Sequence, residues 1–535
     1  MTDTTSAGKR SERPLSLTLL SGAIAAVLVF PLTWLLMRAA EVDVQRATDI
    51  LLRARTVEIF VNSLLLMVGV TVLSILIAVP LAVLTVRTDL PGRRFWTIVV
   101  SLPLAIPSYL GAFAFIALLR PRGIVQGWLE PLGIEELPSI YGLPGAIFII
   151  TLYTYPYVYI TTRAALKTFD KSLVDAARTL NHDWWSTFRQ VTLPQIRPAI
   201  AAGALLAALY AVSDFGTPAF LQAEVFTRQI YLEHRSLGGS DYAAFLSLQL
   251  VALTVFILAV ESRVRGSETL YTSGGTGSTQ QIELGRWKWP ALAGCVLLAF
   301  VTLVMPILLF TWYLLTGQAD PPESFAFQWE WLFNSAYVAG LAALVAAVGA
   351  LPVAYLSARY DSRLGALFER ATYIGYAVPG IVIGLALVFF GANYGSIEVA
   401  GFEFGVYQTV PILVFAYVVR FMPQAVGSTR TSVLQVNPKL NEAARTLGKG
   451  PLARFRRVTL PLIAPGIIAG AALVFLTTMK ELPATLLLRP TGFETLVTRI
   501  WAAEEAGLYG YAAIPAILLL VVSGLSMVLI LRQEE

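Results

Sequence analysis

Long apolar stretches, separated by short polar segments, recur along the whole chain. Most of them reach the roughly 17 to 25 residues that an α-helix needs to cross a bilayer. They lie near residues 15–38, 58–85, 96–119, 143–162, 199–221, 242–261, 289–316, 333–357, 371–392, 407–429, 463–488 and 508–531. The pattern therefore predicts an all-α membrane protein with about twelve transmembrane helices, six in each half of the chain.

Two polar segments interrupt this pattern in the same way, 267 residues apart. The letters AARTL and VTLP occur in both copies with identical spacing. The residues that define the first copy are Asp175, Ala176, Ala177, Asn181, Leu193 and Pro194, and those that define the second are Glu442, Ala443, Ala444, Gly448, Leu460 and Pro461. Such internal similarity indicates two copies of one structural unit.

The repetition extends beyond these two segments. Asn62-Ser63 and Pro107 correspond to Asn334-Ser335 and Pro379 at an offset of 272 residues. We expect both polar segments on the same side of the membrane, so an even number of spans separates them and the repeats run parallel. The expected division is a first repeat over 1–261, a flexible Gly- and Ser-rich linker over 262–288 and a second repeat over 289–535.

The second polar segment has the sequence of a short capped helix. Asn437 supplies an N-cap before a first-turn proline. Gly448 suits the left-handed conformation that ends a helix, and Asn181 takes its place in the first copy. Leucines and the paired alanines form one apolar stripe, and the small alanines permit close approach by a partner. The alternative is an amphipathic helix lying on the lipid, which the identical duplication disfavours.

Basic residues are concentrated in the segments between the apolar runs. With a cytoplasmic N-terminus, most of the 39 Lys and Arg residues fall on the cytoplasmic side, as the positive-inside rule requires. In this assignment Arg420 and Arg430 belong to the second polar loop, and both termini are cytoplasmic. The net charge of +5 then reflects membrane topology rather than nucleic-acid binding.

Composition excludes several functional classes. With 56% hydrophobic and 14% charged residues, the chain is more apolar than soluble domains, in which about 25% of residues are charged. A single cysteine, Cys295, and two distant histidines, His182 and His234, give neither a disulfide framework nor a metal-binding pattern. No G-x-x-x-x-G-K-[ST] phosphate loop occurs. We therefore expect no enzymatic activity, metal site or bound cofactor, and ATP could act only on separate subunits.

Ionisable residues within predicted spans are functional candidates, because burying them is costly, and three of them stand out. Asp214 and Glu481 occupy equivalent positions in the two repeats, and Lys480 precedes Glu481. Helix-breaking residues beside both carboxylates predict interrupted helices, which commonly line a cavity. We expect the three residues to line a translocation path. The alternative is a structural salt bridge, either between Glu481 and Lys480 or between Asp214 and a loop arginine.

The pattern E-A-A-x3-G-x9-I-x-L-P resembles the cytoplasmic EAA loop of binding-protein-dependent ABC importer permeases. The first copy, in loop 170–194, departs from it at Asp175, Asn181 and Val191, and the second, in loop 437–461, matches more closely. The resemblance implies a type I ABC importer permease fold, in the fused two-half form, in the inner or plasma membrane of a prokaryote. It also implies two ABC ATPase copies on the coupling loops and a solute-binding protein outside.

Three stretches, 213–221, 226–231 and 480–496, look like the ferric-iron branch of these permeases. The resemblance implies ferric iron as the transported species, with thiamine, phosphonate or another small solute as alternatives. A proton-coupled secondary transporter is the remote alternative. Its support is Asp89-Leu-Pro-Gly-Arg-Arg94, which is similar to the D-R-x-G-R-R loop of the major facilitator superfamily. That superfamily offers no reason for two EAA loops.

Overall fold

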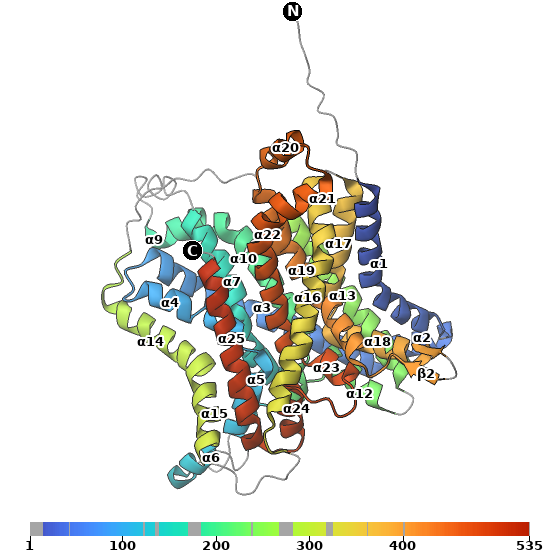
Figure 1. Cartoon of the computed structure of the whole chain (residues 1–535). Helices are drawn as coiled ribbons and strands as arrows, with labels where there is room; N and C mark the ends of the chain where they lie inside the picture. The colour runs from blue at the N-terminus through green and yellow to red at the C-terminus, as the bar shows by residue number, and fades with distance from the viewer. Residues whose placement is uncertain are drawn as a thin grey trace, which may run out of the picture.

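The computed structural model describes residues 14–41, 43–120, 124–133, 138–168, 183–236, 239–266, 282–316, 325–360, 362–399 and 402–533. These residues form helices joined by short turns, together with one β-hairpin. Many of the long helices run in roughly one direction, with α20 at one end of the molecule and α12 and α24 toward the other (Figure 1).

The helices divide between the two repeats. Those of the first are α1 (Leu15–Ala40), α2 (Val44–Leu52), α3 (Ala54–Arg87), α4 (Arg93–Val99), α5 (Ser108–Leu119), α6 (Ile124–Leu129), α7 (Leu143–Thr168), α9 (Trp184–Thr187), α10 (Leu193–Ser213), α11 (Gly216–Phe220), α12 (Phe226–Arg235) and α13 (Ser240–Gly266). Those of the second are α14 (Lys288–Ala299), α15 (Met305–Thr316), α16 (Trp329–Arg359), α17 (Arg363–Ala377), α18 (Gly380–Asn393), α19 (Val410–Gln435), α20 (Pro438–Thr446), α21 (Pro451–Arg454), α22 (Leu460–Met479), α23 (Pro483–Leu488), α24 (Leu496–Glu505) and α25 (Ala513–Gln533).

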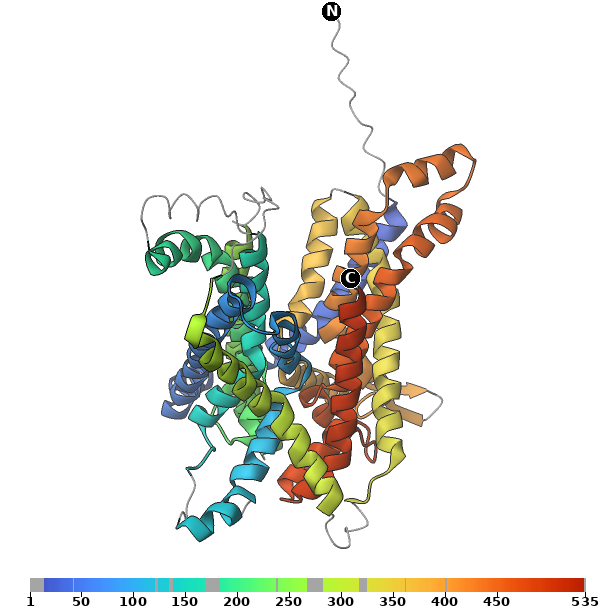
Figure 2. The ribbon, with the colours of Figure 1, turned by 90° about the vertical axis from the view of Figure 1, so that its left-hand side faces the viewer.

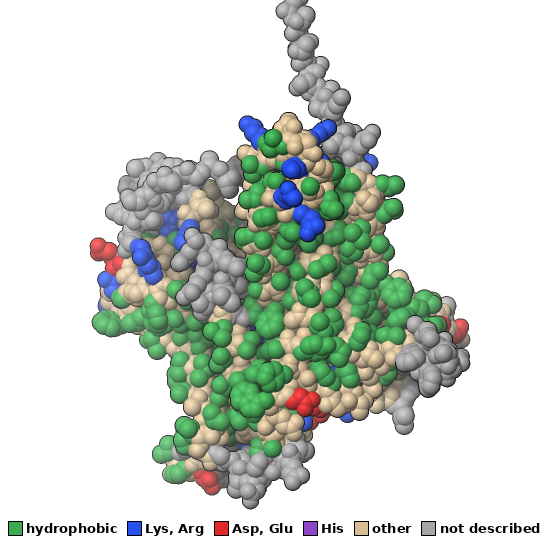
Figure 3. Space-filling view, viewed as in Figure 1, with side chains coloured by type: hydrophobic (Ala, Val, Ile, Leu, Met, Phe, Trp, Pro, Cys, Tyr) green, Lys and Arg blue, Asp and Glu red, His purple; other side chains and the backbone are tan. Residues whose placement is uncertain are grey.

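The all-α membrane fold is confirmed. Within the described residues, ten helical segments are long and apolar enough to cross a membrane, and the bent pair α17–α18 makes eleven. The twelfth predicted span contains only a shorter apolar helix, Tyr509–Leu525. Exposed apolar side chains cover the middle of the molecule, as expected for a surface in contact with lipid (Figure 3).

Four further predicted spans, the third, fifth, ninth and eleventh, are shorter or broken in the structure. The third begins as an unbroken helix only at α5, after Pro107, and the ninth bends by 98° at Pro379. Both prolines precede the first residue of a helix, because proline lacks the amide hydrogen that a continuous helix needs. The fifth and eleventh spans end at Ser213 and Met479, which confirms the interruptions expected beside Asp214 and Glu481.

The two halves repeat the same packing. Helices α3, α7 and α10 pack together in the first half, as α16, α19 and α22 do in the second. The duplicated Asn-Ser pairs contribute to this likeness. The hydroxyl of Ser63 accepts a hydrogen bond from the Phe226 amide at 3.0 Å, and that of Ser335 accepts one from the Leu496 amide at 2.9 Å. Each serine thereby holds the first residue of α12 or α24.

The first span of each half packs against the other half. Helix α1 contacts α17 and α18, and the ring of Trp34 stacks on that of Tyr394 at 4.6 Å. In Figure 2 the blue α1 accordingly lies among the yellow and orange helices of the second half. Conversely, α15 contacts α5, and the Tyr153 hydroxyl donates to the Thr302 carbonyl at 3.2 Å. The repeats are therefore intertwined.

The end of the linker is held by the loop between α3 and α4. The Ile282 amide donates to the Arg87 carbonyl at 2.8 Å, and the Leu284 amide donates to Asp89 Oδ1 at 2.9 Å. Lys288 Nζ lies 2.6 Å from Asp89 Oδ2, and this hydrogen bond lowers the pKa of Asp89. Asp89, which belongs to the segment similar to the major facilitator loop, thus anchors the end of the linker. Linker residues 267–281, expected to be flexible, lie outside the described residues.

A β-hairpin follows α18 and was absent from the sequence prediction. Its strands, β1 (Ser396–Val399) and β2 (Phe402–Gly405), pair antiparallel with Ser396 opposite Gly405. Only four residues contribute to each strand, which is too few for a period-two pattern to stand out beside the long apolar runs.

Candidate functional site

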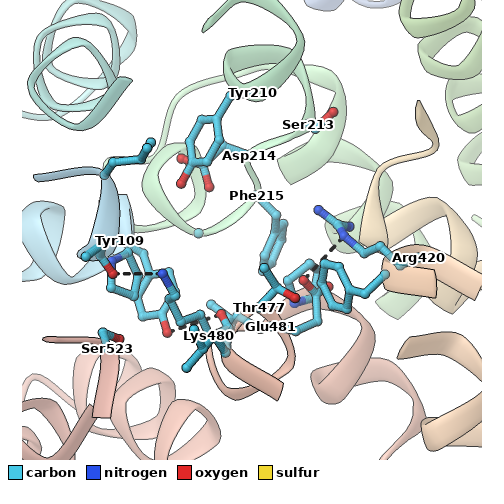
Figure 4. Close-up of a pocket in the computed structure, with 18 of the residues that line it drawn as sticks. Tyr109, Tyr210, Ser213, Asp214, Phe215, Arg420, Thr477, Lys480, Glu481 and Ser523 are labelled. Carbon is cyan, nitrogen blue, oxygen red and sulfur yellow. Dashed lines mark hydrogen bonds and ion pairs between the residues drawn. The ribbon is translucent and has the colours of Figure 1, made fainter. Parts of the chain in front are cut away.

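A cavity of about 400 Å³ lies between the two halves. It is lined largely by residues at equivalent positions of the two repeats. The equivalent pairs are Leu104 with Tyr376, Tyr157 with Gln424, Leu206 with Leu473, Leu209 with Leu476, Tyr210 with Thr477, Ser213 with Lys480, Asp214 with Glu481, Phe215 with Leu482, and Gly216 with Pro483. The structure therefore brings Asp214, Lys480 and Glu481 together at one cavity (Figure 4).

Asp214 follows the last residue of α10, so its side chain leaves the helix beside the break. The Ser108 hydroxyl donates to Asp214 Oδ2 at 2.8 Å and also lies 3.0 Å from the Tyr210 hydroxyl. The Asp214 carbonyl accepts a hydrogen bond from Thr227 Oγ1, on α12, at 2.8 Å. Asp214 is thus connected both to the start of α5 and to α12.

Glu481 pairs with an arginine that the sequence analysis assigned to a loop. Arg420 lies within α19, and its Nε is 3.5 Å from Glu481 Oε2. Assigning Arg420 to the cytoplasmic side was wrong, because α19 continues without interruption through this polar position. The side chains of Arg420 and Glu481 are only 18% and 6% exposed. Their pairing also replaces the alternative in which Glu481 binds Lys480.

Lys480 instead connects the two halves. Its Nζ donates to the Ala105 carbonyl at 2.8 Å, and its own carbonyl accepts from the Tyr109 hydroxyl at 3.4 Å. Ala105 and Tyr109 lie on either side of Pro107, where the polypeptide bends before α5. The lysine therefore satisfies a backbone carbonyl near the proline break.

The first residues of the equivalent helices α5 and α18 differ in a way that matters to the carboxylates. Ser108 and Gly380 are equivalent, and each is the first residue of its helix. Ser108 hydrogen bonds to Asp214. At the equivalent position Gly380, by contrast, a Cβ would overlap both the Arg420 guanidinium and the Glu481 carboxylate. The glycine thus makes room for the ion pair.

A cluster of aromatic rings lies next to the cavity, where α12 and α24 meet. The Trp501 ring stacks on Phe215 at 5.3 Å and on Phe220 at 5.2 Å, and meets Tyr231 edge-on at 5.6 Å. Tyr231 and Trp501 are the sixth residues of the equal-length helices α12 and α24. Phe215 also lines the cavity, so the cluster packs directly against one of its lining residues.

A charge pair also joins α12 to α24. Arg235 and Glu505 are the last residues of α12 and α24, and Arg235 Nη1 lies 3.3 Å from Glu505 Oε1. Equivalent positions that meet across two parallel repeats lie near the pseudo-twofold axis. There an identical charge would repel its copy, and the two different charges attract instead. Sequence reasoning missed the pair because both residues are ordinary surface charges in the sequence.

The second polar segment forms the helix that its sequence predicts. Asn437 Oδ1 accepts a hydrogen bond from the Lys439 amide at 3.0 Å and caps α20. Gly448 has φ +73° and ends the helix with two hydrogen bonds, from its own amide to Arg445 and from the Lys449 amide to Ala444. This is the glycine stop of a Schellman motif.

The apolar stripe of α20 is mostly uncovered. Leu440 and Leu447 are 46% and 77% exposed, Ala443 and Glu442 are also exposed, and only Ala444 is buried. Lys and Arg side chains gather around this helix at the upper end of the molecule (Figure 3). In the first copy, Asp175, Ala176, Ala177 and Asn181 lie outside the described residues, whereas Leu193 and Pro194 begin α10 as Leu460 and Pro461 begin α22.

A hydrogen bond ties α20 to the next membrane helix. The side chains of Asn441 and Thr459 lie 3.3 Å apart, and Thr459 is fully buried. Thr459 is the threonine of the repeated VTLP letters and closes the π-helical turn Phe455–Thr459 that leads into α22. The equivalent turn, Phe188–Thr192, leads into α10. The duplication of this turn in the sequence gave no indication of the contact with Asn441.

Comparisons with known proteins match the two halves separately and the chain as a whole. The family described as "Binding-protein-dependent transport system inner membrane component" matches residues 71–266 and again 350–534. "Fe(3+)-transport system permease protein FbpB 2" of Haemophilus influenzae is 32% identical over 97% of this chain and 98% of that protein. "Ferric transport system permease protein FbpB" of Actinobacillus pleuropneumoniae is 25% identical over 89% and 71%. A crystal structure of a bacterial alginate importer is 19% identical, covers 48% of this chain and 96% of its own, and has a TM-score of 0.40.

Proposed function

The chain belongs to the family of binding-protein-dependent transport system inner membrane components, and on this premise we propose that it carries ferric iron across the membrane. It is a multi-pass permease of an ABC importer and not an enzyme. In the proposal, this one chain supplies both halves of the transport pathway. Two separate ABC ATPase subunits supply the energy, and a solute-binding protein delivers iron from outside.

The observation that carries the proposal is the link between the coupling segment and the cavity. Helix α22 begins at Leu460, beside the Asn441–Thr459 contact, and ends at Met479, one residue before Lys480. Its 20 residues span about 30 Å at roughly 1.5 Å per residue. An ATPase that moves α20 would therefore move the residues at the cavity through one stiff helix. The equivalent α10 would do the same for Asp214.

Two features support an ATPase as the partner of α20. Its leucines are exposed although they are apolar, and exposed apolar residues rimmed by charge mark interaction surfaces. The EAA segment also occurs twice, which supports two ATPase copies for each chain. Both segments and both termini would then be cytoplasmic, and α12 and α24 would face the binding protein.

Ferric iron is supported by the two relatives named as ferric transport permeases and by carboxylates at the cavity. Carboxylate oxygens suit hard cations, and conduction requires a site weak enough to release its ion. Asp214 and Glu481 would attract the ion for a short time rather than hold it. Thiamine and phosphonate remain the substrates to test against iron.

The test is uptake by cells that express the permease with its ATPase and binding protein. We expect radiolabelled ferric iron to accumulate, and thiamine not to. Asp214→Asn and Glu481→Gln should each lower iron uptake, and the double variant should lose most of it while still binding the ATPase. Accumulation of thiamine alone would refute the proposed substrate.

Two further measurements test the architecture. Purification through a tagged ATPase should give one permease chain for two ATPase chains, and a complex with two permease chains would contradict the proposal. Cysteines placed at positions 214 and 481 should react with aqueous thiol reagents in at least one nucleotide state. If neither reacts in any state, the two positions do not lie on an aqueous path.

A further inference from the structure

The charges at the cavity cancel. Its lining contains two carboxylates, Asp214 and Glu481, and two cations, Arg420 and Lys480, so its formal net charge is zero. Among the described residues, no group of three or more His, Cys, Asp or Glu side chains could hold a metal ion. A cavity of this kind attracts a polyvalent cation far less than two unpaired carboxylates would.

The two cations differ in what they contact. Lys480 is directed to the Ala105 carbonyl, whereas Arg420 is directed to the Glu481 carboxylate. Arg420 and Glu481 are both largely buried, and low-dielectric surroundings strengthen the effect of one charge on the other. Arg420 is therefore the residue that offsets the charge of Glu481.

Only the second half contains this arrangement. The position equivalent to Arg420 in the first half is Tyr153, whose hydroxyl donates to the Thr302 carbonyl. There the carboxylate of Asp214 is held by the neutral hydroxyl of Ser108. The cavity thus has one carboxylate with a cationic partner and one with a neutral partner, although the carboxylates themselves are equivalent in the repeat.

We propose that Arg420 determines how strongly the path retains cations. By pairing with Glu481, it leaves Asp214, which is hydrogen bonded to the neutral Ser108, as the one carboxylate of the cavity lining without a directly paired cation. A polyvalent cation is then attracted but not trapped between two carboxylates. Gly380 is part of the same arrangement, because any larger residue there would separate Arg420 from Glu481. This inference rests on the proposed function for the identity of the cation, but its charge argument applies to any polyvalent cation.

The experiment measures binding of Tb³⁺, a luminescent trivalent cation, to the purified full-length permease in nanodiscs. The parent protein should show weak binding. Arg420→Gln should bind Tb³⁺ at least about tenfold more tightly, because Glu481 then lines the same cavity as Asp214 without its paired cation. Adding Glu481→Gln to Arg420→Gln should abolish the gain, and Arg420→Lys should stay close to the parent.

A matched control lies on the same helix. Arg430 of α19 pairs with Glu369 of α17, with Nε 3.2 Å from Oε2, and does not line the cavity. Arg430→Gln removes the same kind of ion pair and should leave Tb³⁺ binding unchanged. If Arg420→Gln gains no Tb³⁺ affinity in correctly inserted protein, or if the gain survives Glu481→Gln, the proposal is wrong.

Iron uptake by the same variants separates this inference from the proposed function. Arg420→Gln should lower iron uptake, and the double variant Arg420→Gln with Glu481→Gln should recover part of that uptake. If the parent transports no iron while the Tb³⁺ results hold, the substrate assignment fails and the charge compensation stands. If the parent transports iron and Arg420→Gln changes neither Tb³⁺ binding nor uptake, only the role given to Arg420 fails.

Discussion

Replacement of Gly448 tests whether the conformation at the end of α20 is needed to engage an ATPase. Gly448 has φ +73°, and nothing lies within 4 Å of a Cβ placed on it. A side chain there would therefore meet no neighbour, and the cost of a substitution comes from the backbone alone. The position separates conformational strain from steric overlap.

The size of the effect follows from that strain. An L-residue in the left-handed region costs about 1–2 kcal/mol relative to glycine, and a β-branched one costs up to about 3 kcal/mol. If docking requires this conformation, Gly448→Ala should weaken ATPase binding by about 5- to 30-fold, since each 1.4 kcal/mol is about tenfold. Gly448→Val should weaken it further, and Gly448→Asn least, because asparagine tolerates the left-handed region.

The assay is titration of the ATPase onto the permease in nanodiscs, with transport measured in parallel. Gly450 supplies the control. It lies two residues away, also has open space around its Cβ, and has φ −66°, which any residue adopts. Gly450→Ala should leave ATPase binding unchanged. Equal affinities for Gly448→Ala and Gly450→Ala would refute the conclusion that the left-handed turn matters for docking.

Three further predictions concern other parts of the path. Trp501→Ala removes a ring that is 7% exposed and should lower the free energy of unfolding by about 3–5 kcal/mol. Arg235→Ala should lower it by at most about 1 kcal/mol, because the ion pair of Arg235 is exposed. Thermal unfolding in detergent measures both, and the reverse order of stabilities would contradict this prediction. Burial, with a smaller contribution from Glu505, raises the pKa of Glu504 from 4.5 to about 7. Protonated Glu504 therefore favours the folded state below pH 4.5, and this stabilisation is lost as the pH rises through about 7. Glu504→Gln should flatten the dependence of stability on pH in this window. Asn441→Ala should leave ATPase binding intact but reduce the amount of substrate transported for each ATP hydrolysed. An unchanged ratio of transport to ATP hydrolysis would contradict the role proposed for the Asn441–Thr459 hydrogen bond.

The sequence was sufficient for features that depend on neighbouring residues. The apolar runs predicted the helices because lipid requires every spanning segment to satisfy its own backbone and to present apolar side chains. The helix-breaking residues beside Asp214 and Glu481 located the interruptions of the fifth and eleventh spans. Gly448 and Asn437 predicted both ends of α20, since caps are decided within a few residues.

Contacts between distant segments required the tertiary structure. The apolar run 407–429 includes position 420, but the charge of Arg420 led to its assignment to a cytoplasmic loop. Only the structure shows that its ion pair with Glu481 holds it inside a helix at the cavity. The crossing of α1 onto the other half, the meeting of Arg235 with Glu505, and the space that Gly380 leaves for an ion pair all depend on how the two repeats pack. The periodicity of a helical sequence indicates which residues share a face, but it does not indicate which other helix that face will contact.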